Sequence, residues 1–166
     1  MKLFIQIPCL NEEFTLKDTL NDLPKSIPGI DEIEILVIDD GSNDNTLKVA
    51  ENWGVSHFVR HKSNQGLASA FRSGIAYCIN NGADIIVNTD GDNQYKGDFI
   101  KDLVNPIITN NSDIVIGSRP INRIKHFSYK KKILQKFGSF VVRKVSNTKV
   151  EDATSGFRAL SRSAAK

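Results

Sequence analysis

Apolar and polar positions follow two patterns along the chain: short apolar runs of strand length, and longer stretches with apolar residues at helical spacing. The short runs predict strands at 3–7, 34–39, 56–60, 85–89 and 114–117. The longer stretches predict helices at 11–23, 44–52, 65–80 and 99–110. Alternating strands and helices are typical of a mostly parallel sheet with helices on both faces. The pattern therefore predicts an α/β, Rossmann-like fold in a single domain over residues 1–166.

Local signals predict where the first elements end and how the pattern changes near the C-terminus. Pro8 is expected to end the first strand, and Asn11 to cap the next helix, with Glu12 and Glu13 in its first turn. Beyond Arg119 the chain is basic, and apolar residues close to helical spacing predict an amphipathic segment: Ile133, Leu134, Phe137, Val141 and Val145.

The composition is that of a soluble globular domain, with 40% hydrophobic and 25% charged residues. No apolar run approaches the roughly 20 residues that cross a bilayer, and residues 1–10 lack the features of a signal peptide. We therefore expect a cytoplasmic protein. Cys9 and Cys78 lack the spacing of a metal site, so we expect both to be free, buried thiols.

Charge is distributed unevenly along the chain. Residues 1–118 contain 9 Lys or Arg against 17 Asp or Glu, whereas residues 119–149 contain 10 Lys or Arg and no acidic residue. This division predicts cation binding in the first part and anion binding in the second. A solvated basic helix face is the simpler alternative for the second part. A nucleic-acid partner is not expected, because no nucleic-acid-binding motif accompanies the positive charge.

Polar residues follow the predicted strands at the positions where ligands usually bind. In an open parallel sheet, ligands bind in the crevice at the carboxyl ends of the strands. Four of these ends are polar here, at 8–13, 39–46, 90–94 and 118–119. The sequence therefore predicts one site built from these four segments.

Asp90 and Asp92 are candidate metal ligands. They flank Gly91, so both carboxylates can face the same side of the chain and bind Mg²⁺ or Mn²⁺ through oxygen. Coordination positions left open on such a metal commonly bind a nucleotide diphosphate. The alternative is an ordinary turn, since Asp, Gly and Asn are common in loops.

The segment from Asp39 to Ser42 suggests nucleoside recognition, because a carboxylate there can accept hydrogen bonds from a base edge or from ribose hydroxyls. A strand end followed by a helix cap is the structural alternative. The first strand is not followed by a Gly-x-Gly-x-x-Gly string, and the chain has no Walker lysine motif. These absences argue against a dinucleotide-binding protein and a P-loop NTPase.

Five short strings, in this order, resemble the family 2 glycosyltransferases of the GT-A fold, and among them the polyprenyl-phosphate sugar transferases. The strings are Pro8-x-x-Asn11-Glu12-Glu13, Asp39-Asp40-Gly41-Ser42, Asn64-x-Gly66, Asp90-Gly91-Asp92 and Ser155-Gly156-Phe157-Arg158-Ala159. The resemblance extends from Ile5 to Ala159. It implies metal-dependent, inverting transfer of a sugar from a UDP- or GDP-sugar to a polyprenyl phosphate, with Mg²⁺ or Mn²⁺ as cofactor.

The resemblance also implies a role for each site residue. The residues that would bind the nucleotide are Pro8, Asn11, Glu12, Asp39, Asp40, Gly66, Asp90 and Arg119. Metal binding falls to Asp90, Asp92 and Gln94, and catalytic roles fall to Asp92 and Asp152. Asp152 would act as a general base on a hydroxyl acceptor, but would orient a lipid phosphate, which is already ionised. Acceptor or phosphate contacts fall to Arg123, Lys130, Ser155 and Arg158.

The basic segment fits a lipid acceptor, because positive charge beside apolar side chains is typical of helices at an anionic membrane surface. Peripheral contact with the cytoplasmic face of a membrane is therefore expected. Other functions remain open: transfer to a saccharide acceptor, or a nucleotide-sugar-binding module without turnover. A nucleotidyltransferase is disfavoured because its first loop should be Gly-rich and basic. Family members normally continue beyond the last of the five strings, so the chain is expected to be truncated at its C-terminus.

Overall fold

The computed structural model describes residues 1–118, 152 and 154–166. Their centre is a sheet of six strands in the order β3-β2-β1-β4-β6-β5. The strands are β1 (Lys2–Cys9), β2 (Glu32–Asp39), β3 (His57–Arg60), β4 (Ile85–Asn88), β5 (Ile114–Ile116) and β6 (Arg158–Ser161). Strands β1 to β4 are parallel, whereas β6 runs antiparallel to both of its neighbours. The predicted mostly parallel α/β sheet is confirmed.

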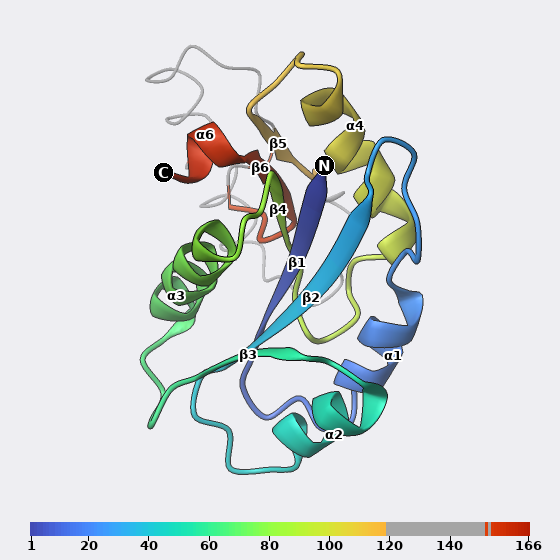
Figure 1. Ribbon diagram of the computed structural model, residues 1–166. Coiled ribbons are helices and arrows are strands. Elements are labelled where there is room, and N and C mark those ends of the chain that lie inside the picture. The colour runs from blue at the N-terminus through green and yellow to red at the C-terminus, as the bar shows by residue number, and fades with distance from the viewer. Residues whose placement is uncertain (119–151, 153) are drawn as a thin grey trace, which may run out of the picture.

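Helices cover both faces of this sheet (Figure 1). One face carries α1 (Leu16–Asp22), α2 (Thr46–Trp53) and α4 (Ile100–Ile108), the last preceded by the 3-10 turn η1 (Gly97–Phe99). The other face carries α3 (Leu67–Asn80) and α6 (Arg162–Ala165). No helix among the described residues is long and apolar enough to cross a membrane.

Alternation along β1 explains why the sheet has two cores. Leu3, Ile5 and Ile7 pack against α1, α2 and α4, whereas Phe4 packs against α3. All four side chains are fully buried. Each such side chain contributes roughly 1.5–3 kcal/mol through removal from water. Strand β1 is therefore buried on both faces and contributes to both cores.

The prediction that Pro8 ends the first strand is wrong, because β1 continues to Cys9 and Pro8 pairs with Ile38 of β2. The carbonyl of Gln6 accepts a hydrogen bond from Thr89, so Pro8, two residues later, faces the same side. On that side β4 pairs with β1 only as far as Gln6. Pro8 has no N–H to donate, but a donor at this position would point to the β4 side, where β1 is no longer paired. Proline therefore costs the sheet no hydrogen bond here.

The prediction that Asn11 caps the first helix is also wrong. Helix α1 begins at Leu16 and has Thr15 at its N-cap, while Asn11 takes a left-handed conformation with φ 58°. The N–H groups of residues 11–13 donate instead to side chains of the β2–α2 loop and of Thr46, the first residue of α2. These hydrogen bonds hold the segment away from a helical path. The basic segment predicted beyond Arg119 lies outside the described residues.

Candidate functional site

A pocket of about 290 Å³ lies where β1, β2 and β4 end. We call it the strand-end pocket. It is lined by Pro8, Cys9, Leu10, Glu12, Asp40, Asn64, Gly66, Leu67, Ala70, Asp90, Gly91 and Asp92. Six residues predicted from the sequence therefore meet at one place: Pro8, Glu12, Asp40, Gly66, Asp90 and Asp92. The loops after these strands converge there because the strands are parallel and share the same carboxyl edge.

Asp40 is held in this pocket by three hydrogen bonds. Its Oδ1 accepts from His61 Nδ1 at 2.6 Å and from the N–H of Gln65 at 2.9 Å, and its Oδ2 accepts from the N–H of Gly66 at 2.8 Å. Burial by itself would raise the pKa of Asp40, but these hydrogen bonds outweigh it and hold the pKa below its ordinary value. Asp40 is therefore an ionised carboxylate of fixed orientation, and it anchors the loop that ends at Gly66.

Asp39 is buried beside Asp40 but acts within its own loop, where its Oδ1 accepts from the N–H of Ser42 at 2.9 Å. The turn also needs Gly41, with φ +82°, because a Cβ there would lie 2.6 Å from the backbone carbon of Ser63. Asp39 does not line the strand-end pocket. It shapes the loop after β2, and its predicted contact with a nucleotide stays a prediction.

The loops after β1 and β2 are joined by reciprocal hydrogen bonds. Asn11 donates its N–H to Ser42 Oγ at 3.0 Å, and its side-chain oxygen accepts from the N–H of Asn43 at 2.9 Å. Glu12 donates its N–H to Thr46 Oγ1 at 2.8 Å. Asn11 is thus placed as a loop-joining residue next to the pocket, whereas Glu12 reaches the pocket wall.

Asp90 and Asp92 line the pocket from the β4 side, on a turn with little room for a side chain at the glycine between them. A Cβ at Gly91 would lie 3.1 Å from Cys9 Sγ and 3.3 Å from Glu12 Cγ. Asp92 accepts from the N–H of Gln94 at 3.1 Å and from Gln94 Nε2 at 2.6 Å. Gln94 therefore lies beside Asp92 but does not itself line the pocket, and its role as a metal ligand stays a prediction.

The Ser155 to Arg158 segment lies against the same turn. A Cβ at Gly156 would be 3.0 Å from Asp90 Oδ1, and the carbonyl of Gly156 accepts from Asn88 Nδ2 at 2.9 Å. Arg158 donates through Nε to the carbonyl of Ser155 at 3.1 Å. The predicted acceptor residues Ser155 and Arg158 are thus brought next to the Asp-Gly-Asp turn.

Asp152 is 1% exposed and accepts from Thr154 Oγ1 at 2.9 Å, while its carbonyl accepts from the N–H of Ser155. It therefore lies at the start of the predicted acceptor segment. Arg119, Arg123 and Lys130 lie outside the described residues.

Sequence reasoning missed two residues that support the site, His61 and Asn88. His61 bonds directly to Asp40, and Asn88 joins Gly156 to Gln6, whose Nε2 donates to Asn88 Oδ1 at 2.9 Å. Asn88 carries a usable signal, since it is a polar residue at the end of an otherwise apolar, fully buried strand. His61 carries none, because a single histidine after a short strand is an ordinary loop residue.

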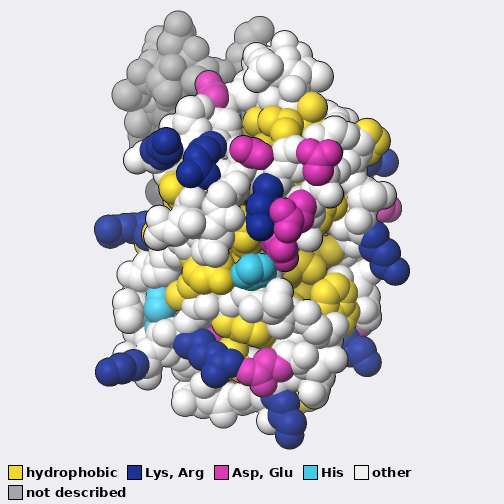
Figure 2. Space-filling model, viewed as in Figure 1, with side chains coloured by type: hydrophobic (Ala, Val, Ile, Leu, Met, Phe, Trp, Pro, Cys, Tyr) yellow, Lys and Arg dark blue, Asp and Glu magenta, His cyan; other side chains and the backbone are white. Residues whose placement is uncertain are grey.

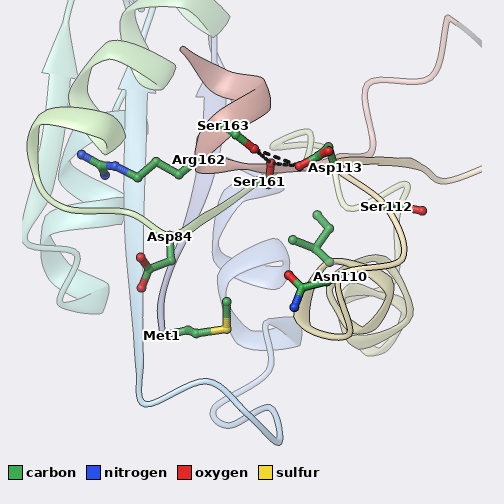
Figure 3. Close-up of a pocket in the computed structure, with 9 residues that line it drawn as sticks. Met1, Asp84, Asn110, Ser112, Asp113, Ser161, Arg162 and Ser163 are labelled. Carbon is green, nitrogen blue, oxygen red and sulfur yellow. Dashed lines mark hydrogen bonds between the residues drawn. The ribbon is translucent and has the colours of Figure 1, made fainter.

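A second pocket, of about 360 Å³, lies at the opposite edge of the sheet (Figure 3). Residues from the N-terminus, the β4 side and α6 line it, among them Met1, Asp84 and Arg162. Its Asp113 accepts hydrogen bonds from Ser161 and Ser163, which lower its pKa. None of the predicted site residues lines this pocket. The strand-end pocket is therefore the candidate site.

The single sheet with helices on both faces and its acidic strand-end pocket define an α/β domain of the GT-A type. The chain belongs to glycosyl transferase family 2, whose family model matches residues 4–166. The sequence-based resemblance to this family is confirmed.

Two relatives and one solved structure show the range of similar proteins. The chain is 31% identical over 182 residues to the UDP-N-acetylglucosamine–dolichyl-phosphate N-acetylglucosaminyltransferase of Methanococcus voltae, covering 99% of this chain and 71% of the relative. It is 30% identical over 166 residues to the undecaprenyl-phosphate mannosyltransferase of Micrococcus luteus, covering 96% of this chain and 66% of the relative.

The structure is similar to that of glucosyl-3-phosphoglycerate synthase from Mycobacterium tuberculosis, solved with Mn²⁺, UDP-glucose and phosphoglyceric acid. The TM-score is 0.75 at 22% identity, over 98% of this chain and 57% of the solved chain. This similarity establishes the fold. The chain spans little more than half of that protein.

Proposed function

We propose that this chain is the donor-binding catalytic domain of an inverting, metal-dependent transferase that moves a sugar from a UDP- or GDP-sugar to a polyprenyl phosphate. The observation that carries the proposal is the meeting of Glu12, Asp40, Asp90 and Asp92 in one pocket, from three different strand ends. The names of both relatives, which describe transfer to dolichyl or undecaprenyl phosphate, support the acceptor.

Asp40 is proposed to bind the nucleoside, together with Pro8, Glu12 and Gly66. A carboxylate offers about four acceptor positions, two on each oxygen. In Asp40, two are used at Oδ1 and one at Oδ2. The remaining position at Oδ2 is proposed to accept one N–H of a base or one ribose hydroxyl. The two loops that hold Asp40 and Glu12 make this a preorganised site.

Asp90 and Asp92 are proposed to hold Mg²⁺ or Mn²⁺, with Gln94 beside them. Their carboxylates suit a hard cation. Cys9, the thiol in the same pocket, does not, because burial and the nearby carboxylates raise its pKa and keep it protonated. Two protein carboxylates would leave coordination positions for the donor diphosphate, and the metal would offset charge on that leaving group.

The acceptor phosphate is proposed to lie beside the Ser155 to Arg158 segment, which packs against Asp90 through Gly156. A polyprenyl phosphate is already ionised and needs no general base. Asp152, at the start of this segment, is therefore proposed to orient the acceptor. Arg119, Arg123 and Lys130 are proposed to add positive charge, with the basic segment contacting the cytoplasmic face of a membrane.

Calorimetric titration of UDP, GDP and their sugars, with and without Mn²⁺, tests the donor site. We expect metal-dependent binding of one nucleotide by the wild-type chain. The variants Asp92→Ala and Asp92→Asn should weaken it by at least about tenfold, since a metal ligand is removed. The exposed Asp102→Ala on α4 is the matched control and should bind as the wild type does. A folded wild-type chain that binds neither nucleotide would contradict the proposal.

A further inference from the structure

Two histidines at the β3 edge make bridges of the same design between the β2 side of the sheet and α3. His57 lies between Glu34, 3.0 Å from its Nε2, and the hydroxyl of Tyr77, 2.9 Å from its Nδ1. His61 lies between Asp40, 2.6 Å from its Nδ1, and Ser73 Oγ, 3.0 Å from its Nε2. We call these the His57 bridge and the His61 bridge. Each joins a carboxylate to a hydroxyl of α3.

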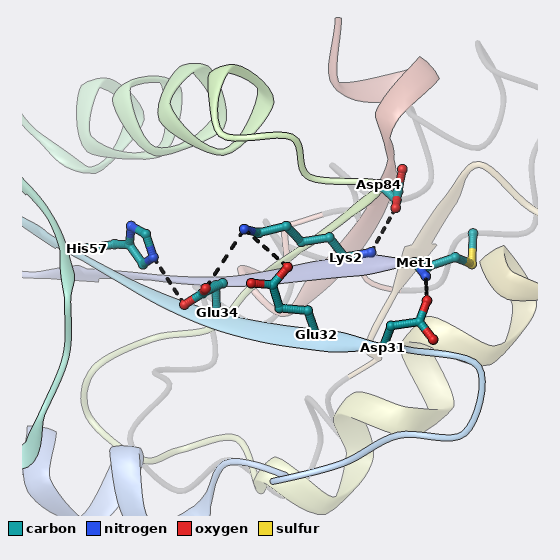
Figure 4. A network of polar contacts seen from close by, with 7 residues as sticks. All are labelled: Met1, Lys2, Asp31, Glu32, Glu34, His57 and Asp84. Atoms are coloured by element: carbon teal, nitrogen blue, oxygen red, sulfur yellow. Dashed lines mark hydrogen bonds and ion pairs between the residues drawn. The ribbon is translucent and has the colours of Figure 1, made fainter.

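The bridges differ in their position relative to the strand-end pocket. Figure 4 shows the Glu34 end of the His57 bridge, where Lys2 lies near Glu32 and Glu34; none of these three residues lines that pocket. The His61 bridge ends on Asp40, which does line it. The His61 bridge is also more deeply buried, with side-chain exposures of 8% for His61 and 6% for Asp40, against 21% for His57 and 25% for Glu34.

The hydrogen bonds of the His61 bridge can all form with a neutral imidazole. Asp40 is ionised and can only accept, so Nδ1 of His61 carries the proton that it donates. Nε2 is then the acceptor for the hydroxyl of Ser73. Ser73 thus orients the ring, and the ring orients the carboxylate. The contact also helps to direct Oδ2 of Asp40 toward the N–H of Gly66, which is itself part of the pocket wall.

Asp40, His61 and Ser73 are the residue types of a hydrolase triad, but their setting does not suit nucleophilic catalysis. Ser73 lies in the middle of α3, where backbone N–H groups are used within the helix. Such groups cannot form an oxyanion hole for a substrate held at Ser73. The hydroxyl is therefore better suited to orienting the imidazole than to attacking a carbonyl.

We infer that His61, oriented by Ser73, is a positioning residue of the donor site: it fixes the Asp40 carboxylate and the loop to Gly66 in the conformation that binds the nucleoside. The inference rests on the proposed function. It predicts that the His61 bridge controls nucleotide affinity. The His57 bridge, which has the same types of hydrogen-bonding groups, should contribute only to the stability of the fold.

Four variants test this role in nucleotide titrations with Mn²⁺. His61→Leu removes both hydrogen bonds and should weaken nucleotide binding by at least about tenfold. His61→Asn keeps a donor near the position of Nδ1 and should restore binding to within about threefold of wild type. Ser73→Ala should give an intermediate loss. His57→Leu is the matched control and should lower the thermal midpoint while leaving affinity unchanged.

Amide hydrogen exchange provides a readout that does not depend on any ligand. The N–H groups of Gln65 and Gly66 donate to Asp40, so they should exchange faster in His61→Leu and as in the wild type in His61→Asn and His57→Leu. Unchanged affinity in His61→Leu overturns the inference, as does a His61→Asn variant as impaired as His61→Leu. A wild-type chain without nucleotide binding overturns the proposed function, whatever the exchange rates show.

Discussion

At the scale of single residues, Asp44 links the two loops that build the nucleotide side of the site. Its Oδ1 accepts from the N–H of Thr46 at 2.9 Å, at the start of α2. Its Oδ2 accepts from the N–H of Glu13 at 3.1 Å, in the loop after β1. One carboxylate therefore accepts from the first N–H of a helix and holds a neighbouring loop, which is more than its place in a short polar string indicates.

Asp44 should make the free energy of unfolding depend on pH in the acidic range. Burial would raise its pKa, but the hydrogen bonds from Thr46 and Glu13 hold it below the ordinary value of 3.8. A carboxyl whose pKa is lower in the folded than in the unfolded state stabilises the folded protein at pH values above its unfolded-state pKa. This stabilisation is lost as the pH falls from the unfolded-state pKa through the folded-state pKa. Asp44→Asn should therefore be less stable at pH 7 and lose less stability between pH 5 and pH 3.

Urea unfolding of Asp44→Asn and wild type at both ends of this range measures the difference. The exposed Asp102→Asn on α4 serves as the control and should follow the wild-type curve. Parallel pH profiles for wild type and Asp44→Asn would show that Asp44 is not an acid-sensitive link.

The placement of a site residue could be predicted from the sequence where its partners are close to it along the chain. Asp90 and Asp92 flank one glycine after a buried strand, so their approach needs no knowledge of distant partners. Asn11 could not be placed in the same way, because its partners Ser42 and Asn43 are more than 30 positions away. The path of residues 11–13 follows from those distant hydrogen bonds, not from local helix signals.

At the scale of elements, α3 approaches the sheet closely at Gly74. A Cβ at Gly74 would lie 2.9 Å from Ile38 Cδ1 and 3.0 Å from Gln6 Cδ. Gln6 is fully buried, and its amide is tied to Asn88 by a 2.9 Å hydrogen bond, so it cannot move aside cheaply. The glycine therefore sets how near the helix lies to β1 and β2.

Gly74→Ala should destabilise the protein despite the better helix propensity of alanine. Alanine gains about 1 kcal/mol in a helix interior. Overpacking against Gln6 and Ile38 costs about 1–3 kcal/mol or more, so the net change should be a loss. Denaturant unfolding measures it. Ala76→Ser, on the exposed side of the same helix, should change stability by less than about 0.5 kcal/mol. A more stable Gly74→Ala would show that helix and sheet separate easily there.

Elements with a clear apolar pattern were predictable whatever their length, and β6, which lacks such a pattern, was not. Helix α3 and strand β4 lie within the ranges that their apolar spacing indicates. Strand β6 has only four residues, Arg158–Ser161, two of them polar, and no alternation distinguishes it from a loop. It becomes a strand because its backbone pairs antiparallel with β4 and β5, a contact between parts of the chain far apart in sequence.

At the scale of the whole molecule, the sheet lies between two hydrophobic cores and contributes side chains to both. Strand β1 contributes Ile5 to the core under α1 and α4, and Phe4 to the core under α3. The surface over these layers carries charges of both signs close together (Figure 2). If both cores depend on the same central strands, neither layer should open without the other.

The two cysteines of the chain report on this cooperativity, because Cys9 lies in the first core and Cys78 in the second. Burial raises the pKa of Cys78 to about 12, and burial with the nearby carboxylate of Glu12 raises that of Cys9, so both stay protonated in the folded protein. Since the thiolate is the reactive form, neither should react with an aromatic disulfide until it is exposed.

In a series of urea concentrations, both thiols should become reactive at one midpoint, equal to that of the loss of helical circular dichroism. Cys9→Ala and Cys78→Ala, each leaving a single thiol, assign the signals. A Cys78 that reacts at lower urea than Cys9 would mean that the α3 layer opens as a separate unit. In that case the His61 bridge to Ser73 and the α3 side of the strand-end pocket, Leu67 and Ala70, would be lost before the core under α1, α2 and α4 unfolds.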